Sequence, residues 1–232
     1  MLGFFDPMYL IIVGPAMLLA LWAQMKVKGA FGKWSQVAAS SRLTGAQAAQ
    51  RMLQRAGLAD VGIERAKGFL SDHYDPRVRK LRLSPSVYDG QSVAAMGIAC
   101  HEAGHALQHA QGYAPLQMRT AIVPVASIGS WLSWPLIIIG GLMSTKLALA
   151  GVILFGAVVV FQLITLPVEF DASSRAKKQL TSLGILQSQT EAGGVSAVLN
   201  AAAMTYVAAT VTALAQLLYF AMRLGLLGGR RD

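Results

Sequence analysis

Four long, uncharged apolar stretches constrain this chain more than any other feature of its sequence. A helix crosses a hydrocarbon layer of about 30 Å with roughly 17 to 25 mainly apolar residues. The stretches that reach this length without a charged side chain are residues 7–25, 121–143, 147–168 and 201–222. Because the chain is 54% hydrophobic and only 13% charged, it has more apolar surface than a soluble domain of its size would carry. The sequence therefore predicts an integral membrane protein with four transmembrane helices. The first of them lacks the basic start and the cleavage site of a secretory signal, so we interpret it as a retained anchor.

The positive charge of the chain is concentrated between the first two predicted spans. The net charge is +9, and thirteen of the twenty Lys and Arg residues lie within residues 26–119, interspersed with six acids. This region lacks the basic, aromatic-rich pattern of a nucleic-acid groove, so a nucleic-acid partner is not expected. The positive-inside rule instead predicts that residues 26–119 and 169–200 face the cytoplasm and that both termini lie on the opposite side. The basic C-terminal residues Arg223, Arg230 and Arg231 weigh against this orientation.

The region between the first two spans has the pattern of a small α+β domain. Residues 44–56 have helical periodicity with Thr44 as a candidate cap, and residues 61–83 favour short strands separated by turns. Ser92 is a candidate cap for a helix over residues 93–110. The predicted fold is therefore mainly α, with four transmembrane helices and a small α+β, zincin-like catalytic domain at the cytoplasmic membrane face.

Three local features lead to more specific expectations. Gly29, Gly32 and Ser35 indicate a short connector after the first span. Residues 80–84 are interpreted as an edge strand, which is either an ordinary edge or one that holds an extended peptide by backbone pairing. Pro167 suits the first turn of a new helix that begins where the third span ends.

The predicted helix over residues 93–110 carries the pattern HExxH. Residues four apart lie one above the other on a helix, so His101 and His105 can both bind one ion. Two neutral imidazoles suit Zn²⁺, which keeps an open position for water and lowers the pKa of that water toward about 7. Glu102 lies beside this position and can accept the proton of the water and pass it to the leaving amine. The pattern predicts a zinc-dependent hydrolase, since a helix with incidental histidines would have no reason to place these groups among small apolar residues.

A third ligand must come from elsewhere in the chain. The long form of the motif would need a histidine at position 111, which is Gln111, so that subclass is excluded. The downstream acids are Glu169, Asp171 and Glu191. Glu169 is the best candidate, because it lies two residues beyond Pro167, whereas Asp171 is about 200° around the same helix. The alternative for Glu169 is an interfacial anchor residue.

Four segments together resemble a known family. They read DHYDP at 72–76, LSPSVY at 83–88, HEAGHALQ at 101–108 and LPVEFDA at 166–172. In combination they resemble the YugP-like neutral zinc metallopeptidases of bacterial membranes, over residues 26 to about 178. A more distant resemblance is to the HtpX and CAAX prenyl protease group.

The resemblance implies a function and a set of site residues. It implies one Zn²⁺ per chain held by His101, His105 and Glu169, with Glu102 as catalytic base. It also implies a multi-pass protein of the bacterial cell membrane that cleaves unfolded or membrane-associated polypeptides. In the more distant group a Glu-x-x-x-Asp pattern supplies a carboxylate that steadies a ligand histidine. Here the corresponding residue is Ser173, so Ser173 or Asp171 is left to take that role.

Two other classes of protein compete with this interpretation. A site-2-type intramembrane protease also uses HExxH, but the uncharged run before His101 covers only residues 91–100 and is too short to span. A non-enzymatic membrane scaffold or chaperone with a structural zinc would have no need of Glu102. The sequence leaves open the oligomeric state, the roles of His73 and His109, and the residue that stabilises the oxyanion. The candidates for that last role are Tyr74, Tyr88, Tyr113 and Tyr206.

Overall fold

The chain forms two compact units. The computed structural model describes residues 6–68 and 71–226, so the predicted contribution of Arg230 and Arg231 lies outside the described residues. Among the described residues, unit 1 comprises residues 6–24, 117–166 and 205–226, and unit 2 comprises residues 25–68, 71–116 and 167–204.

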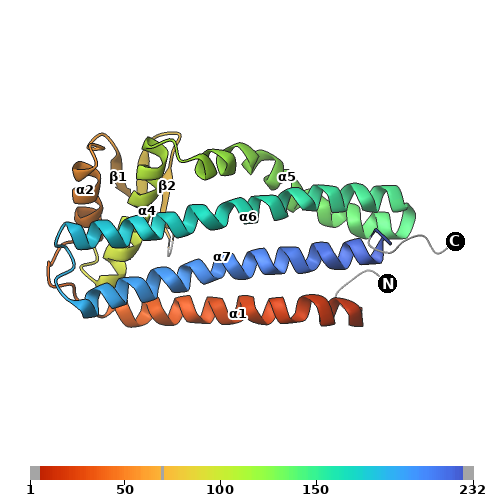
Figure 1. Cartoon of the computed structure of the whole chain (residues 1–232), viewed down its shortest axis with the longest axis horizontal. Coiled ribbons are helices and arrows are strands. Elements are labelled where there is room, and N and C mark those ends of the chain that lie inside the picture. Colours follow the sequence, from red (N-terminus) through yellow and green to blue (C-terminus); the bar gives the residue numbers. More distant parts are fainter. Residues whose placement is uncertain (1–5, 69–70, 227–232) are drawn as a thin grey trace. The chain divides into compact units, whose positions relative to one another are not determined.

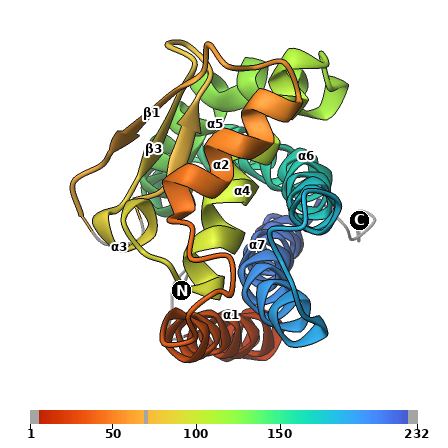
Figure 2. The same cartoon turned by 90° about the vertical axis from the view of Figure 1, so that its left-hand side faces the viewer.

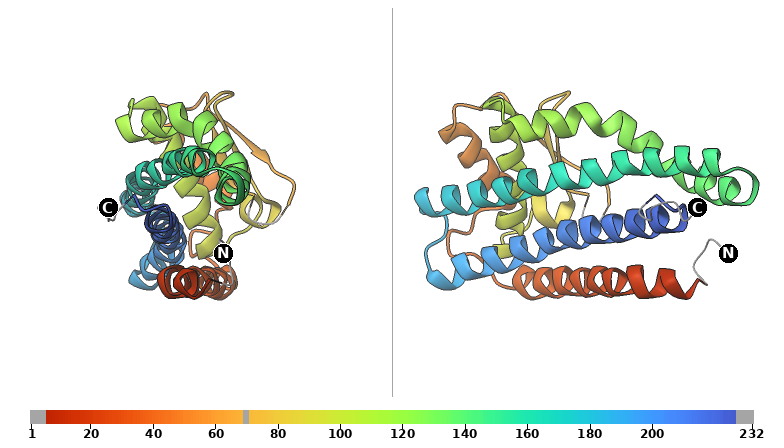
Figure 3. Two further views of the ribbon diagram at one scale, coloured as in Figure 1. Left: turned by 90° about the vertical axis from the view of Figure 1, so that its right-hand side faces the viewer. Right: turned by 45° about the vertical axis from the view of Figure 1, so that its right-hand side comes forward.

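Parts of four long helices build unit 1. These helices are α1 (Pro7–Ser35), α5 (Ala114–Met143), α6 (Thr145–Ser182) and α7 (Gln189–Arg223), and each is long and apolar enough to cross a membrane (Figure 3). Aromatic rings pack edge to face inside the unit, with ring centroids 5.0 Å apart for Tyr9 and Tyr219 and 5.4 Å for Trp134 and Phe220. Large apolar side chains also cover the outside, as shown by Leu142, which is 84% exposed. An apolar exterior of this kind fits lipid contact. The prediction of four membrane-spanning helices is confirmed in length and composition.

The start of α1 and the end of α7 lie together in unit 1. The Tyr219 hydroxyl donates a hydrogen bond of 2.8 Å to Asp6, and Arg223 pairs with the same carboxylate at 3.4 Å. The turn between α5 and α6 lies at the same end of the unit (Figure 3). Both helix ends and the α5–α6 turn therefore share one side, as expected for four consecutive spans.

Unit 2 surrounds the HExxH helix with a small sheet and several helices. Its elements are α2 (Gly45–Arg55), β1 (Gly62–Arg65), β2 (His73–Asp75), β3 (Lys80–Leu83), α3 (Pro85–Tyr88) and α4 (Val93–Ala110). Residues 25–35, 167–182 and 189–204 of the long helices complete the unit. In Figures 1 and 2, α4 runs between the sheet with α2 on one side and the adjoining parts of α6 and α7 on the other.

Local capping signals define the two predicted helices of unit 2. Thr44 and Gln47 form a reciprocal capping box at the start of α2, with bonds of 3.2 and 2.9 Å. Ser92 accepts a hydrogen bond of 3.2 Å from the backbone N–H of Ala95 at the start of α4. The predicted helices over 44–56 and 93–110 are therefore confirmed to within a residue.

The helix α4 is buried on nearly every side. Its residues Met96, Ala99, Cys100 and Ala103 are fully buried in the core of unit 2. Burial raises the pKa of the Cys100 thiol far above its usual value, so this cysteine is an uncharged core residue.

The prediction that residues 80–84 form an edge strand is wrong. The order of strands in the sheet is β1-β3-β2, with β1 parallel and β2 antiparallel to β3. The strand β3 is therefore central, and both of its edges are already hydrogen-bonded. The alternation of Leu81 and Leu83, both fully buried, predicts a strand with one face in the core but says nothing about its neighbours.

Two predicted helix boundaries are also wrong. α1 continues through Gly29 and Gly32 to Ser35, and α6 continues through Pro167 to Ser182. Glycine and proline disfavour helix interiors by about 1 and 3 kcal/mol, respectively, but packing outweighs this preference in both places. Trp34 packs against α7 at the end of α1, and Val168, Ala172 and Ala176 are fully buried just after Pro167.

Candidate metal centre

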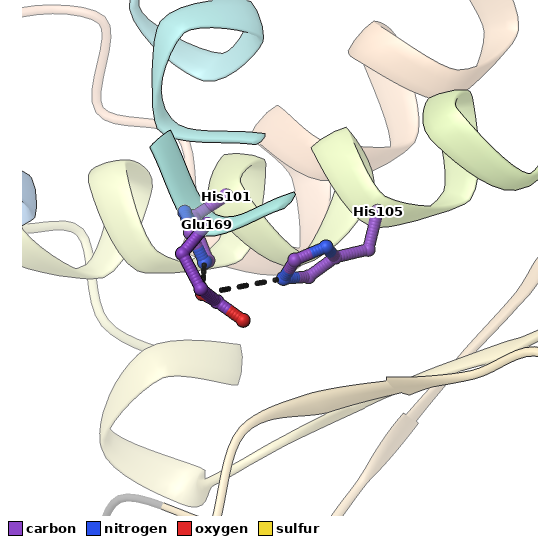
Figure 4. Close-up of side chains that lie close together, drawn as sticks. All are labelled: His101, His105 and Glu169. Carbon is purple, nitrogen blue, oxygen red and sulfur yellow. Dashed lines mark hydrogen bonds and ion pairs between the residues drawn. The ribbon is translucent and has the colours of Figure 1, made fainter. Parts of the chain in front are cut away.

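The candidate metal centre lies in unit 2, where α4 meets the part of α6 that follows Pro167. His101 and His105 are one turn apart on α4, and their ring centroids are 4.8 Å apart. Glu169 on α6 points between the two rings, as Figure 4 shows. Its Oε2 atom lies 3.1 Å from Nε2 of His101 and 3.7 Å from Nε2 of His105. The structure therefore brings together all three residues that the sequence suggests as ligands.

The three donor atoms fit a zinc ion in type and spacing. They are two imidazole nitrogens and one carboxylate oxygen, and all lie within 4.8 Å of one another. With Zn–N and Zn–O bonds of about 2.0 to 2.1 Å, neighbouring ligands of a tetrahedral site are about 3.3 Å apart. The two distances of 3.1 and 3.7 Å lie on either side of this value. Two histidines and one glutamate are also a donor set of catalytic zinc sites, in which the fourth position stays open.

Gly104 allows the two helices to approach closely enough for this geometry. A Cβ atom at position 104 would lie 2.7 Å from the carbonyl oxygen of Ala172 and 3.2 Å from the carbonyl carbon of the same residue. No side chain other than hydrogen fits there unless α4 and α6 separate. Gly104 lies between His101 and His105, and Ala172 lies three residues after Glu169, so this close approach sets the spacing of the three candidate ligands.

In each candidate ligand histidine, Nδ1 contacts a second polar side chain. Nδ1 of His101 lies 3.1 Å from Oγ of Ser173, and Nδ1 of His105 lies 3.0 Å from Oε1 of Gln108. Because Nδ1 is occupied in both rings, Nε2 is the nitrogen that faces the candidate ion. Such outer contacts fix the ring orientation of metal-binding histidines. Ser173, left open by the sequence, therefore contacts His101.

The charge state of His105 depends on opposing effects. Burial lowers the pKa of the imidazole, but the neighbouring carboxylates of Glu169 and Glu102 outweigh burial and raise the pKa above its usual value. The negative charges of Glu169 and Glu102 thus lie near the buried His105 ring, and they favour a positive charge between them.

Glu102 is placed differently from the three candidate ligands. It is only 9% exposed, and its carboxylate makes no hydrogen bond or ion pair with any residue in 6–68 and 71–226. Glu102 follows His101 directly on α4, so this side chain has hydrogen-bonding capacity left for a water molecule or substrate beside the metal centre.

The other downstream acids lie outside the ligand cluster. Asp171 accepts a hydrogen bond of 2.8 Å from the side-chain amide of Gln108 and pairs with Arg175. Glu191 accepts hydrogen bonds of 2.6 Å from the backbone N–H groups of Ser40 and Gln187. Asp171 therefore contacts the site through Gln108, whereas Glu191 stabilises the chain around the start of α7.

Two further histidines have partners of their own. Nδ1 of His109 lies 2.8 Å from the hydroxyl of Tyr74 on β2, and Nδ1 of His73 lies 2.8 Å from the carbonyl oxygen of Ser71. His109 is one turn beyond His105, so the His109–Tyr74 pair ties the end of α4 to the sheet. Neither histidine is part of the metal-ligand cluster.

Two of the segments that carry the family resemblance contact each other. The half-buried carboxylate of Asp72 accepts hydrogen bonds from the backbone N–H of Ser84 at 2.8 Å and from its hydroxyl at 3.0 Å. Burial raises the pKa of the Asp72 carboxyl above its usual value, although these hydrogen bonds oppose the shift. The contact joins residues 72–76 to the start of α3 and stabilises the sheet beside α4.

Gln108 is the site residue that sequence reasoning missed. Its side chain is fully buried and contacts His105, the backbone carbonyl of Val168 and Asp171. The available signal was spacing, since a residue three positions after His105 lies on the same face of the helix.

The fold and the site together define a class of protein. Helices suited to membrane spans and an HExxH helix opposed by a glutamate are the features of membrane-bound zinc metallopeptidases. The chain belongs to the family described as "Putative neutral zinc metallopeptidase", whose sequence profile matches residues 9–225. It is 49% identical over 217 residues to the "Putative membrane protease YugP" of Bacillus subtilis (strain 168). The aligned region covers 93% of this chain and 96% of the relative. No solved structure matches the chain. The predicted family is therefore confirmed.

Proposed function

We propose that this chain is a membrane-bound, zinc-dependent metalloendopeptidase that hydrolyses peptide bonds with Glu102 as general base. The observation that carries the proposal is the arrangement of His101, His105 and Glu169 around one point. The neighbouring Glu102 carboxylate makes no hydrogen bond or ion pair within the described residues. Membership of the zinc metallopeptidase family and the name of the Bacillus relative support it.

Each residue has a distinct task in this mechanism. His101, His105 and Glu169 hold one Zn²⁺ per chain, which when bound acts as a Lewis acid and lowers the pKa of water. Glu102 takes a proton from the attacking water and then gives that proton to the amine nitrogen as the peptide bond breaks. The proton is thus transferred within the site, and Glu102 ends the cycle as the carboxylate with which it began.

The placement of the site supports a particular class of substrate. We infer that residues 26–119 and the helical segment from Glu169 form the catalytic region, and that it faces the cytoplasm of a bacterial cell. Glu169 follows the third predicted span directly, so the site is suited to unfolded or membrane-associated polypeptides. A site-2-type protease is less compatible, because α4 is not among the helices long and apolar enough to span.

Removal and return of the metal test this proposal. The purified protein in detergent should cleave an unfolded test protein, lose this activity after dialysis against a chelator, and regain it with about one equivalent of Zn²⁺. A His105→Ala variant purified in parallel controls for contaminating proteases and should stay inactive throughout. Chelator-resistant cleavage by the parent, or equal cleavage by His105→Ala, would refute a zinc peptidase.

A further inference from the structure

Both N–H groups and the oxygen of the buried Gln108 amide have hydrogen-bonding partners. Its Nε2 donates to the backbone carbonyl of Val168 at 2.8 Å and to Oδ2 of Asp171 at 2.8 Å. Its Oε1 lies 3.0 Å from Nδ1 of His105. The side chain is 0% exposed, so water does not compete for these contacts.

The partners of Gln108 determine which way its amide must face. A backbone carbonyl and an ionised carboxylate can only accept hydrogen bonds. If the amide were turned over, its oxygen would face two acceptors in a buried place, and only one of its N–H groups could find a partner, at Nδ1 of His105. That arrangement is strongly unfavourable. Oε1 of Gln108 therefore faces His105 and accepts a hydrogen bond.

This orientation determines the tautomer of His105. Because Oε1 is an acceptor, Nδ1 of His105 must carry a hydrogen and donate it. In the neutral ring the free electron pair is then on Nε2, the atom that lies 3.7 Å from Glu169. The Ser173 hydroxyl beside His101 can either donate or accept, so it restricts the tautomer of that ring less.

Asp171 is in turn held by a cation. Nε of Arg175 donates to Oδ2 of Asp171, and Nη1 of Arg175 donates to Oε1 of Gln111. The guanidinium also lies 5.7 Å from the ring centre of Tyr113. Arg175 holds the Asp171 carboxylate in place, and Asp171 holds the Gln108 amide in its one favourable orientation.

We propose that Gln108 is a positioning residue that fixes the tautomer and orientation of His105 for metal binding, and that Asp171 and Arg175 act on the metal centre only through Gln108. The inference deepens the proposed function and rests on it. Ser173 stands where the Glu-x-x-x-Asp pattern has its Asp. In this chain the carboxylate comes from Asp171, two residues earlier, and it acts on His105 through the Gln108 amide.

The first test measures zinc affinity by competition with a chromophoric chelator, without any protease assay. Gln108→Met keeps the size of the side chain but removes both kinds of hydrogen bond, and should weaken zinc binding about 10- to 100-fold. Gln50→Met, the same change at an exposed position of α2, is the matched control and should bind zinc as the parent does. Equal affinities for Gln108→Met and Gln50→Met would overturn the proposal.

A double-mutant cycle tests the order of the contacts. Asp171→Ala removes a half-buried side chain outside the core, so the variant should fold even if Gln108→Met does not. It should weaken zinc binding by less than Gln108→Met in the parent, and should have almost no further effect in a Gln108→Met background. Full additivity of the two changes would show that Asp171 acts independently of Gln108 and would contradict the inference.

A spectroscopic readout reports on the tautomer itself. In the Co²⁺-loaded protein each metal-bound histidine with a hydrogen on Nδ1 gives a hyperfine-shifted proton signal that exchanges with solvent. The signal of His105 should exchange slowly in the parent and much faster in Gln108→Met, while that of His101 stays as it was. An unchanged His105 signal would overturn the inference. Failure of the parent to bind Zn²⁺ or Co²⁺ would instead refute the proposed function.

Discussion

A methyl group at position 104 should damage the metal centre without unfolding the protein. In Gly104→Ala the new Cβ would lie 2.7 Å from the carbonyl oxygen of Ala172, whereas carbon–oxygen contacts are normally no shorter than about 3.3 Å. The helices α4 and α6 must therefore separate by about 0.6 Å at this point. Metal–ligand distances tolerate deviations of about 0.2 Å, so Glu169 can no longer share an ion properly with His101 and His105.

The effect on stability should be much smaller than the effect on zinc. Overpacking of a core typically destabilises by about 1 to 3 kcal/mol, but alanine is favoured over glycine in a helix interior by about 1 kcal/mol. The net change in the free energy of unfolding of the metal-free protein should thus be about 0 to 2 kcal/mol. Weakening of one ligand should reduce zinc affinity at least tenfold, because mutation of residues that only hydrogen-bond to the ligands already has an effect of this size.

The assay compares Gly104→Ala with Gly97→Ala on the same helix. At Gly97 a Cβ would lie 3.4 Å from the nearest atom, a side-chain carbon of Val195, which is an ordinary contact. Both variants are titrated with zinc against a chelator, and both are unfolded by denaturant in detergent. If Gly104→Ala binds zinc as tightly as Gly97→Ala, the close approach of α4 and α6 does not set the ligand spacing.

Two further predictions concern the third ligand and the orientation in the membrane. Glu169→Ala should lose most of its zinc on dialysis, because a ligand is removed, whereas Asp171→Ala should weaken binding but keep most of the metal. The reverse result would mean that Asp171 is the ligand. Single cysteines introduced at the exposed positions Ser40 and Ser188 in a Cys100→Ala background should react only with reagents that enter the cytoplasm. Labelling of either position in intact cells by an impermeant reagent would reverse the predicted topology.

Features that depend on nearby residues could be predicted from the sequence. Thr44 and Ser92 cap their helices with N–H groups three residues away, so the signal and its effect lie in the same short segment. His101 and His105 are joined by the geometry of one helix turn in the same way. The four long apolar stretches needed only length and composition, and the family resemblance needed only short motifs.

Features that depend on distant segments could not be predicted in the same way. The Gln108 amide hydrogen-bonds to Val168 and Asp171, which lie 60 and 63 residues further along the chain. The need for glycine at position 104 comes from the backbone of Ala172. The central position of β3 depends on its pairing with β1 and β2. The continuity of α6 through Pro167 depends on tertiary packing, which helix propensity does not predict.

The central claim is that Glu102 transfers a proton in a zinc peptidase, and Glu102→Gln tests it most directly. The amide has nearly the shape of the carboxylate and Glu102 is not a ligand, so the zinc content should remain near one per chain. Since an amide cannot accept the proton of water, cleavage of an unfolded test protein in detergent should fall at least about 100-fold, the lower range of general acid–base assistance. Equal cleavage by Glu102→Gln and the parent at full zinc content would contradict the hydrolytic mechanism and leave the zinc with a structural role.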